Sequence, residues 1–321
     1  MENINSRPII IDTDPGVDDA LAILFAHRAP VLQIQGITTV FGNQDIEKTT
    51  RNACSLIDMI GARTPVYRGA SRPLTKYALR AESHGETGLG SYQQNGKLRN
   101  EMPLTKPAEG DGISFLARGI TPRTQIACLG PTTNLALLAN LYPEALRQAD
   151  ALIIMGGVFG QVGNTTPWAE FNVYCDPDAL AQLLAFDGVK KILIPADICR
   201  EVTMSETDFL HMQDSSLSQA IQEIIQEYVT YYKSDHIHGG FAGGVMYDTL
   251  VIACLLWPEL FNTELRHVVV ETGDGPARGA TAVDLKRNSQ PNCLLITHNR
   301  ERVPSGIDAQ TVKQRLLQLL T

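Results

Sequence analysis

Short apolar segments alternate with helical patterns along the chain up to about residue 200. Runs of β-branched and aliphatic residues predict buried strands, and apolar residues three or four positions apart predict helices. The expected strands are Arg7–Ile11, Gln33–Val40, Thr124–Leu129, Ala151–Met155 and Lys190–Ile194. The expected helices are Ala20–Ala26, Gln44–Ile60, Asn134–Leu141 and Pro177–Ala185. This alternation predicts an α/β fold with a mostly parallel central sheet flanked by helices.

Residues that favour helix ends support these boundaries. Asn43 is expected to cap the helix Gln44–Ile60, Gly61 to end it, and Asp176 to cap the helix that starts at Pro177. Beyond residue 200 we expect a long helical stretch with a break near 214–216, two more helices and three short strands. These are Glu206–Ser234, Met246–Trp257, Ala309–Leu320, His267–Glu271, Thr281–Leu285 and Cys293–Thr297.

The rest of the pattern indicates one domain over residues 1–321. The segment Arg68–Glu109 is rich in Gly, Ser, Pro and charge and has weak periodicity, so we expect a long functional loop there. No repeat or linker interrupts the chain.

A net charge of −8 argues against binding to nucleic acid backbones, which requires a basic face. The longest apolar run, Leu250–Trp257, is far shorter than the ~20 residues that span a bilayer.

The N-terminus and the cysteines indicate a cytoplasmic protein. The three isoleucines at 9–11 lead directly into Asp12, so no signal peptide is visible. The six cysteines form no CxxC pair and stand mostly inside apolar segments. Such cysteines are typical of reduced, buried side chains.

An acidic cluster follows the first strand and carries most of the chemical information. Asp12, Asp14, Asp18 and Asp19 fall within eight residues, and a Pro-Gly turn can fold the last two back toward Asp14. In open α/β sheets, ligands bind at the carboxyl ends of the strands, which is where these aspartates are expected. Clustered carboxylates repel one another unless a cation neutralises them, and oxygen ligands favour Ca²⁺ or Mg²⁺. The alternative is that these residues only end the strand and favour the helix N-terminus.

The sequence resembles the inosine-uridine preferring nucleoside hydrolase family. The opening motif DTDPGVDDALAI is followed in order by six further family-like segments, which makes the match specific. They are ITTVFGN (37–43), HGETGLG (84–90), LGPTTNLAL (129–137), IMGG (154–157), AEFNVYCDPDA (169–179) and YDTLVIA (247–253). The resemblance implies a Rossmann-like open sheet and Ca²⁺-dependent hydrolysis of ribonucleosides to ribose and free base, as in nucleoside salvage.

The resemblance also implies roles for the four N-terminal aspartates. Asp14 would ligate Ca²⁺ and act as general base on the metal-bound water that attacks the sugar. Asp19 would bind the ion through both oxygens, and Asp18 would accept a hydrogen bond from a ribose hydroxyl. Asp12 would hold Asp14 in place.

Two further metal ligands are implied by the resemblance. Asp248 matches the family's distal aspartate, although on sequence alone an aspartate there is more often a helix cap. The backbone carbonyl of Leu129 is the expected fourth ligand. Thr132 and Thr133 are alternatives to Leu129, and either threonine could instead cap the next helix.

The resemblance places substrate contacts in three other segments. Polar oxygens near the sugar stabilise the oxocarbenium-like transition state of glycosidic cleavage. Asn43, Asn164, Glu170 and Asn172 match the family's ribose contacts. Phe171 would supply an apolar wall, Met155 would pack against the sugar, and His84 would lie near the pocket mouth. A polar loop at 170–172, core packing of Met155 and a solvated His84 are the structural alternatives.

One position departs from the family pattern. Many members have His before the distal aspartate, where it can protonate the leaving base, but this chain has Tyr247. Its hydroxyl could donate a hydrogen bond to the base, or its ring could stack on it. His236 and His238 are other possible donors. The segment 195–200 also differs from the family pattern, and the sequence assigns it no function.

Two other functions remain open at this level. Loss of the histidine suits a protein with altered base specificity or one that only binds nucleosides. A magnesium-dependent phosphohydrolase of the haloacid dehalogenase type also begins with a strand and DxD, but there the motif continues differently. The expected partners are a small ribonucleoside and further copies of the chain in a homodimer or homotetramer, with no nucleic acid and no membrane.

Overall fold

The computed structural model describes residues 6–75, 80–81, 83–90, 105–235, 240–297 and 306–321. At its centre is an eight-stranded sheet in the order β3-β2-β1-β4-β5-β6-β12-β9, and only the pair β12–β9 is antiparallel. Its strands are β1 (Arg7–Thr13), β2 (Leu32–Thr39), β3 (Val66–Arg68), β4 (Gln125–Cys128), β5 (Ala151–Met155), β6 (Lys190–Ile194), β9 (Thr263–Arg266) and β12 (Cys293–Ile296). This arrangement confirms the predicted mostly parallel α/β sheet.

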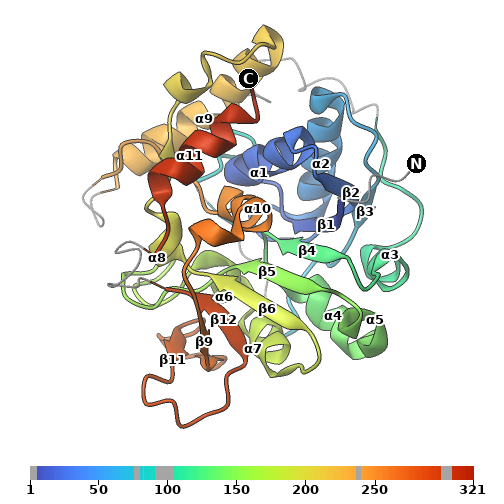
Figure 1. Ribbon diagram of the computed structural model, residues 1–321, viewed down its shortest axis with the longest axis vertical. Helices are drawn as coiled ribbons and strands as arrows, with labels where there is room; N and C mark the ends of the chain where they lie inside the picture. The colour runs from blue at the N-terminus through green and yellow to red at the C-terminus, as the bar shows by residue number, and fades with distance from the viewer. Residues whose placement is uncertain (1–5, 76–79, 82, 91–104, 236–239, 298–305) are drawn as a thin grey trace.

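Helices cover both faces of the sheet (Figure 1). One face carries α1 (Val17–Arg28), α2 (Ile46–Ile60), α9 (Ser215–Lys233), α10 (Thr249–Leu256) and α11 (Ala309–Gln318). The other face carries α3 (Gly112–Gly119), α4 (Thr133–Leu141), α5 (Pro143–Arg147) and α7 (Pro177–Ala185). Side chains of β1 alternate between the two cores: Ile9 and Ile11 join the first and Ile10 the second.

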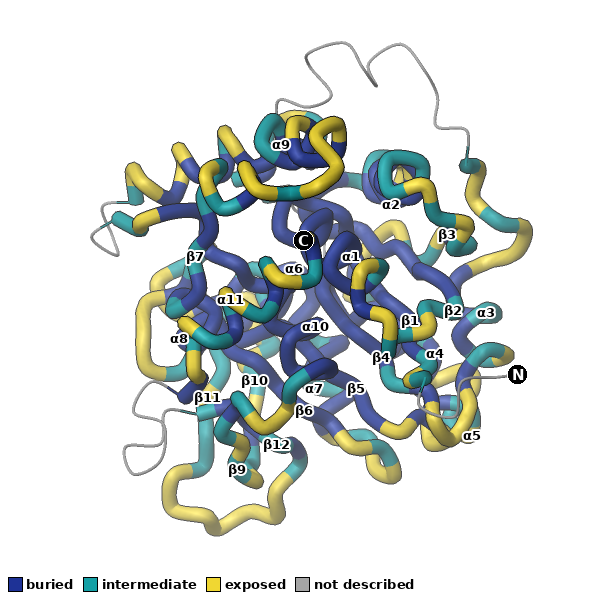
Figure 2. Tube along the Cα trace, turned by 45° about the horizontal axis from the view of Figure 1, so that its top comes forward, coloured by how far each residue is buried: buried dark blue, intermediate teal, exposed yellow. Residues whose placement is uncertain are grey.

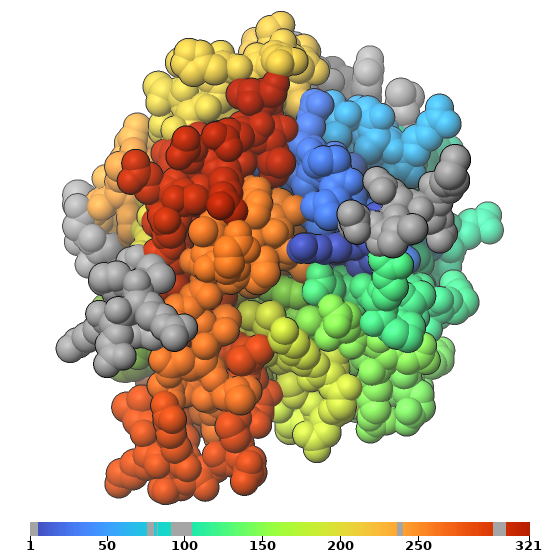
Figure 3. All heavy atoms as spheres, in the orientation of Figure 1, coloured from blue at the N-terminus to red at the C-terminus, as the bar shows by residue number. Residues whose placement is uncertain are grey.

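Burial is concentrated where the first strands meet α1 and α10 (Figure 2). All three isoleucines of β1 are fully buried, and burying each contributes about 1.5–3 kcal/mol. Figure 3 shows α11 lying on the surface between α9 and α10, where its buried Val312 and Leu316 join the first core. No helix among the described residues is long and apolar enough to cross a membrane.

Shorter elements complete the fold around the main sheet. They are α6 (Phe171–Cys175), α8 (Ala196–Cys199), β7 (Thr203–Met204), a 3₁₀ turn at Glu206–Phe209, β8 (Gly244–Val245), another at Pro258–Leu260, β10 (Val268–Val270) and β11 (Thr281–Val283). Strands β10 and β11 pair with each other, as do β7 and β8. The sequence pattern predicted β10 and β11 to within a few residues, but α6, α8, β7 and β8 are too short for it to show.

The predicted helix ends are partly confirmed. Asp176 caps α7 by accepting a hydrogen bond from Ala179 N (3.1 Å), and Gly61 ends α2 with a φ of 72°. The prediction that Asn43 caps α2 is wrong. The cap is Asp45, which accepts from Lys48 N (3.0 Å), while Asn43 turns toward Asp14. The stretch 206–234 does break as predicted, because Asp214 caps a separate helix, α9.

Candidate active site

A cavity of about 620 Å³ opens at the carboxyl edge of the central sheet. Asp14 follows β1, Leu129 follows β4 and Met155 ends β5, so the sheet brings these three segments to one place. The sequence-predicted residues that line the cavity are Asp18, Asn43, His84, Leu129, Met155, Asn164, Glu170, Phe171, Asn172, Tyr247 and Asp248. The remaining predicted residues, Asp12, Asp14 and Asp19, are fully buried beside it.

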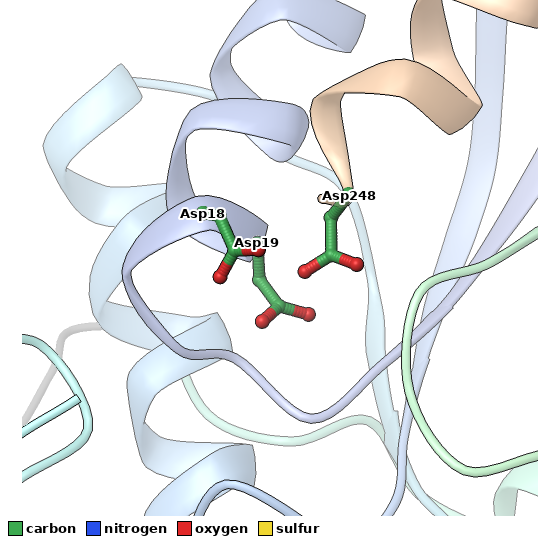
Figure 4. A group of neighbouring side chains, drawn as sticks. All are labelled: Asp18, Asp19 and Asp248. Carbon is green, nitrogen blue, oxygen red and sulfur yellow. The ribbon is translucent and has the colours of Figure 1, made fainter. Parts of the chain in front are cut away.

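Three carboxylates form a tight acidic group at the cavity. Asp18 and Asp19 project from the start of α1, and Asp248 from the start of α10 (Figure 4). Each offers an oxygen within 4.8 Å of the other two. Burial and the charge of Asp19 raise the pKa of Asp18 to about 7, and burial followed by repulsion from Asp18 raises the pKa of Asp248. A divalent cation would relieve this repulsion, so the group could hold a metal ion.

Asp14 lies next to this group and keeps one oxygen without a partner. Asn43 links the two carboxylates, because its backbone N donates to Asp14 Oδ2 (2.7 Å) and its Nδ2 donates to Asp19 Oδ2 (3.1 Å). Asp14 Oδ1 is buried without a hydrogen bond. Burial and the charge of Asp19 raise the Asp14 pKa. A Cβ at Gly130 would lie 2.3 Å from Oδ1, so only glycine permits this close approach. An unpartnered buried carboxylate oxygen fits a metal ligand.

Asp12 is held by other residues than Asp14. Its Oδ1 accepts hydrogen bonds from Thr38 Oγ1 (2.5 Å) and Asn134 Nδ2 (2.7 Å). Burial raises its pKa to about 6. Because Asn134 also donates to the carbonyl of Thr39 (3.0 Å), Asp12 ties the end of β1 to that of β2. Any support that it gives to Asp14 therefore runs through the backbone.

Leu129 and its threonine alternatives differ in their surroundings. Leu129 lines the cavity, and its carbonyl accepts a hydrogen bond from Asn172 Nδ2 (2.6 Å). Thr132 and Thr133 are not lining residues, and Thr133 donates its hydroxyl hydrogen to Asp176 Oδ2 (2.6 Å). The carbonyl of Leu129 therefore has the better position for a ligand on this wall.

Glu170 and Asn164 also line the cavity. Glu170 caps α6, and its carboxylate accepts hydrogen bonds from Asn172 N (2.9 Å), Gly157 N (3.1 Å) and Val173 N (3.2 Å). Asn164 Oδ1 accepts from Phe171 N (2.9 Å). Burial outweighs the three hydrogen bonds to Glu170 and raises its pKa to about 7. Both polar side chains are thus fixed where they border the cavity.

The raised pKa of Glu170 predicts a pH-dependent stability. Its pKa lies near 7 in the folded protein against 4.5 in a free chain, so the protonated form is favoured on folding. The stability that it contributes is present below pH 4.5 and is lost as the pH rises through 7, by up to about 3 kcal/mol. Urea unfolding from pH 4.5 to 8.5 should show this fall in the parent, and Glu170→Gln should lack that part of it. If the free energy of unfolding fell equally with pH in the parent and in Glu170→Gln, the raised pKa of Glu170 would be contradicted.

His84 is buried and neutral beside the acidic group. Its Nδ1 accepts a hydrogen bond from Val17 N (3.0 Å), which places the ring on the first turn of α1. Burial lowers its pKa to about 3, so its approach to Asp18 Oδ1 (3.9 Å) is not an ion pair at neutral pH. The ring stacks on Tyr228 with centroids 5.2 Å apart. His84 therefore borders the cavity as predicted and is not solvated.

Tyrosines of α9 form a wall that the sequence analysis missed. Tyr228, Tyr231 and Tyr232 all line the cavity, and their i, i+3, i+4 spacing on one helix face was the available signal. Ring centroids are 4.8 Å apart between Tyr228 and Tyr232 and 6.1 Å apart between Tyr232 and Tyr247. Tyr247 thus lies at the end of an aromatic row. His236 and His238, the other suggested donors, lie outside the described residues.

Comparison with known sequences gives a consistent picture. The family model described as inosine-uridine preferring nucleoside hydrolase matches residues 9–314. A non-specific ribonucleoside hydrolase of Klebsiella pneumoniae is 39% identical over 291 residues, which cover 90% of this chain and 92% of that protein. A pyrimidine-specific ribonucleoside hydrolase of Salmonella paratyphi C is 36% identical over 298 residues, 90% of this chain and 93% of that protein.

Solved structures of nucleoside hydrolases share the fold of this chain. A plant nucleoside hydrolase superimposes with a TM-score of 0.85 at 26% identity and covers 98% of this chain and 99% of its own. A purine-preferring ribonucleoside hydrolase from Gardnerella vaginalis gives a TM-score of 0.84 at 24% identity, with 98% of each chain covered. The second likeness concerns the fold alone.

Proposed function

Because the chain belongs to the inosine-uridine preferring nucleoside hydrolase family and is accordingly a ribonucleoside hydrolase, we propose that Ca²⁺ is its metal ion and Asp14 its general base. The observation that carries this proposal is the set of buried carboxylates with the unpartnered Asp14 Oδ1. This family match also removes the phosphohydrolase alternative. Ribonucleosides are the substrates, and the base preference is a separate question.

The donor set favours a hard cation. The proposed ligands are the carboxylates of Asp14, Asp19 and Asp248 and the carbonyl of Leu129, all oxygen donors. Asp18 belongs to the tight acidic group as well, and it also lines the cavity. We assign Asp18 to a ribose hydroxyl. When bound, the cation would supply positive charge that lowers the pKa of water and attracts the hydroxyl groups of the sugar.

The polar wall orients the sugar and stabilises positive charge on it. Asn43, Asn164, Glu170 and Asn172 are the proposed hydrogen-bond partners of ribose, with Met155 and Phe171 packed against it. Asp14 takes a proton from the attacking water, and the carboxylate of Glu170 faces the developing oxocarbenium charge. Because backbone donors already hold Glu170, it needs little reorganisation during the reaction.

The leaving base is proposed to lie against Tyr247. This residue is buried, lines the cavity and packs beside Tyr232. Burial raises the pKa of its hydroxyl to about 12, so the group stays protonated at neutral pH and donates a hydrogen bond. The tyrosine wall offers flat apolar surfaces on which an aromatic base stacks.

Replacing the Tyr247 hydroxyl tests its part in leaving-group activation. Tyr247→Phe keeps the ring and removes the donor, and we expect kcat to fall about 10²-fold, the lower range for a positioned proton donor. The matched control is Tyr231→Phe, which removes a hydroxyl from the more exposed end of the same wall. An unchanged kcat for Tyr247→Phe would leave only stacking for this residue and require another donor.

A nucleoside panel tests the proposed function as a whole. The protein is incubated with purine and pyrimidine ribonucleosides and Ca²⁺, and released reducing sugar is measured. Turnover of at least one nucleoside is expected. Calorimetric binding of inosine or uridine without any sugar release would instead support the binding-only alternative.

The single domain, the cytoplasmic location and the homodimer or homotetramer remain predictions from the sequence.

A further inference from the structure

Asp197 fastens the loop that leads to Asn164, although it does not line the cavity. The two oxygens of this buried carboxylate accept hydrogen bonds from successive backbone groups, Phe159 N (2.8 Å) and Gly160 N (2.7 Å). The adjoining Ala196 N donates to the carbonyl of Gly157 (2.8 Å). Helix α8 therefore binds three residues of this loop, Gly157, Phe159 and Gly160.

Arg200, at the end of α8, holds the next residue of the same loop. Its Nη1 donates to Gln161 Oε1 (2.9 Å), and its side chain is buried with only 8% of the residue exposed. Its Nε and Nη2 have no hydrogen-bond partner. Burial of a guanidinium group costs free energy unless partners compensate for it. Here the compensation comes from the bond to Gln161 and from the nearby Glu170 carboxylate, whose pKa the charge of Arg200 lowers.

The cavity side of the loop is fixed by substrate-facing residues. Gly157 N donates to Glu170 Oε2 (3.1 Å), and Asn164 Oδ1 accepts from Phe171 N (2.9 Å). The loop thus lies between Glu170 on its cavity side and Asp197 on its other side. Thr281 of β11 adds a third attachment, because its Oγ1 accepts from Val158 N (3.0 Å).

We propose that Asp197 and Arg200 are positioning residues of this ribonucleoside hydrolase, which hold residues 157–164 so that Asn164 and Glu170 meet the ribose. This role rests on the proposed ribose contacts of those two residues. It gives the segment 195–200, which the sequence left without a function, a place in the reaction. Neither side chain lines the cavity, so removal of Asp197 should act through the loop. Arg200 also lies close enough to Glu170 and Tyr247 for its charge to lower the pKa of both, so its removal should act on these two residues as well.

Kinetics of Asp197→Asn and Arg200→Met test this role. Asn retains one acceptor but presents an NH₂ group to the second backbone N–H, and Met removes the donor at similar volume. With Ca²⁺ and a nucleoside that the parent hydrolyses in the panel, each variant is expected to raise KM about 10-fold, with a smaller change in kcat. Arg200→Lys should regain part of the loss, because Lys can still donate to Gln161. The control Asp111→Asn removes the charge of the exposed cap of α3, where an Asn oxygen can still accept from Ser114 N (2.9 Å in the parent), and should leave KM unchanged.

A double-mutant cycle with Asn164→Ala separates this role from general destabilisation. If Asp197 acts through Asn164, Asp197→Asn should cost about 10-fold in kcat/KM in the parent and less than about 2-fold in the Asn164→Ala background. Equal losses in both backgrounds, or no loss in either, would overturn the proposal.

Two measurements without turnover keep this result distinct from failure of the proposed function. Hydrogen exchange at the amides of Phe159 and Gly160 should quicken in Asp197→Asn, and calorimetry should show weaker binding of ribose in the presence of Ca²⁺. A parent protein that cleaves no nucleoside would refute the proposed function, while these two changes would still support the positioning role. Unchanged exchange and unchanged ribose affinity would refute the positioning role even in an active enzyme.

Discussion

Asp14→Asn is expected to lower kcat by about 10³-fold or more. The amide cannot take a proton from water, and a positioned general base contributes about 10²–10⁴-fold. The variant should fold, because the Asn oxygen can still accept the hydrogen bond from Asn43 N that now goes to Asp14 Oδ2. The replaced NH₂ group falls at the site of Oδ1, which has no partner. Steady-state hydrolysis of a nucleoside that the parent cleaves, with ribose affinity measured in parallel, checks this prediction.

The control for this variant removes a partly buried, hydrogen-bonded carboxylate away from the cavity. Asp58 accepts a hydrogen bond from Thr105 N (3.0 Å) and does not line the cavity. Asp58→Asn should keep the parent kcat. An Asp14→Asn enzyme with near-parent kcat would show that another group accepts the proton, and the general-base assignment would then be wrong.

Removal of metal is expected to abolish turnover completely. Dialysis against a chelator should leave a protein without measurable ribose release, and added Ca²⁺ should restore activity at about one ion per chain. The buried group Asp18, Asp19 and Asp248 favours a cation because the cation relieves the mutual repulsion of the carboxylates, and without the cation the attacking water keeps its high pKa. The melting temperature should rise on adding Ca²⁺, because an ion that binds only the folded state stabilises it.

Variants of the acidic group separate specific metal binding from a general salt effect. Asp248→Asn should raise the Ca²⁺ concentration needed for half-maximal activity and reduce the rise in melting temperature that Ca²⁺ causes. Asp58→Asn should leave both quantities unchanged. Full activity after exhaustive chelation would contradict a metal-dependent mechanism for this enzyme.

The sequence predicted the sheet well because its central strands carry their own signal. The strands Ala151–Met155 and Lys190–Ile194 have the predicted bounds. The first is apolar at every position and the second is apolar after its two lysines, which is typical of strands buried on both faces. Strands β3 and β9 were missed. Each lies at an edge of the sheet, where polar residues are tolerated and the pattern weakens.

The sequence predicted which residues surround the cavity better than it predicted how their side chains contact one another. Motif order identified the residues around the cavity, but it could not show that Asp18 joins Asp19 and Asp248 in the tight group, since that depends on how α1 packs against α10. Asn43 was misassigned as a helix cap because its side chain suits that position equally well. The tyrosine wall was missed because a helical row of aromatic residues is equally typical of a core.

A crystal structure of the protein soaked with Ca²⁺ and ribose tests the central claim most directly. We predict one ion with oxygen ligands at about 2.3–2.6 Å from Asp14, Asp19, Asp248 and the carbonyl of Leu129, and two ribose hydroxyls on the same ion. An ion bound elsewhere, or ribose bound with no ion among these aspartates, would contradict the proposed metal site and the mechanism built on it.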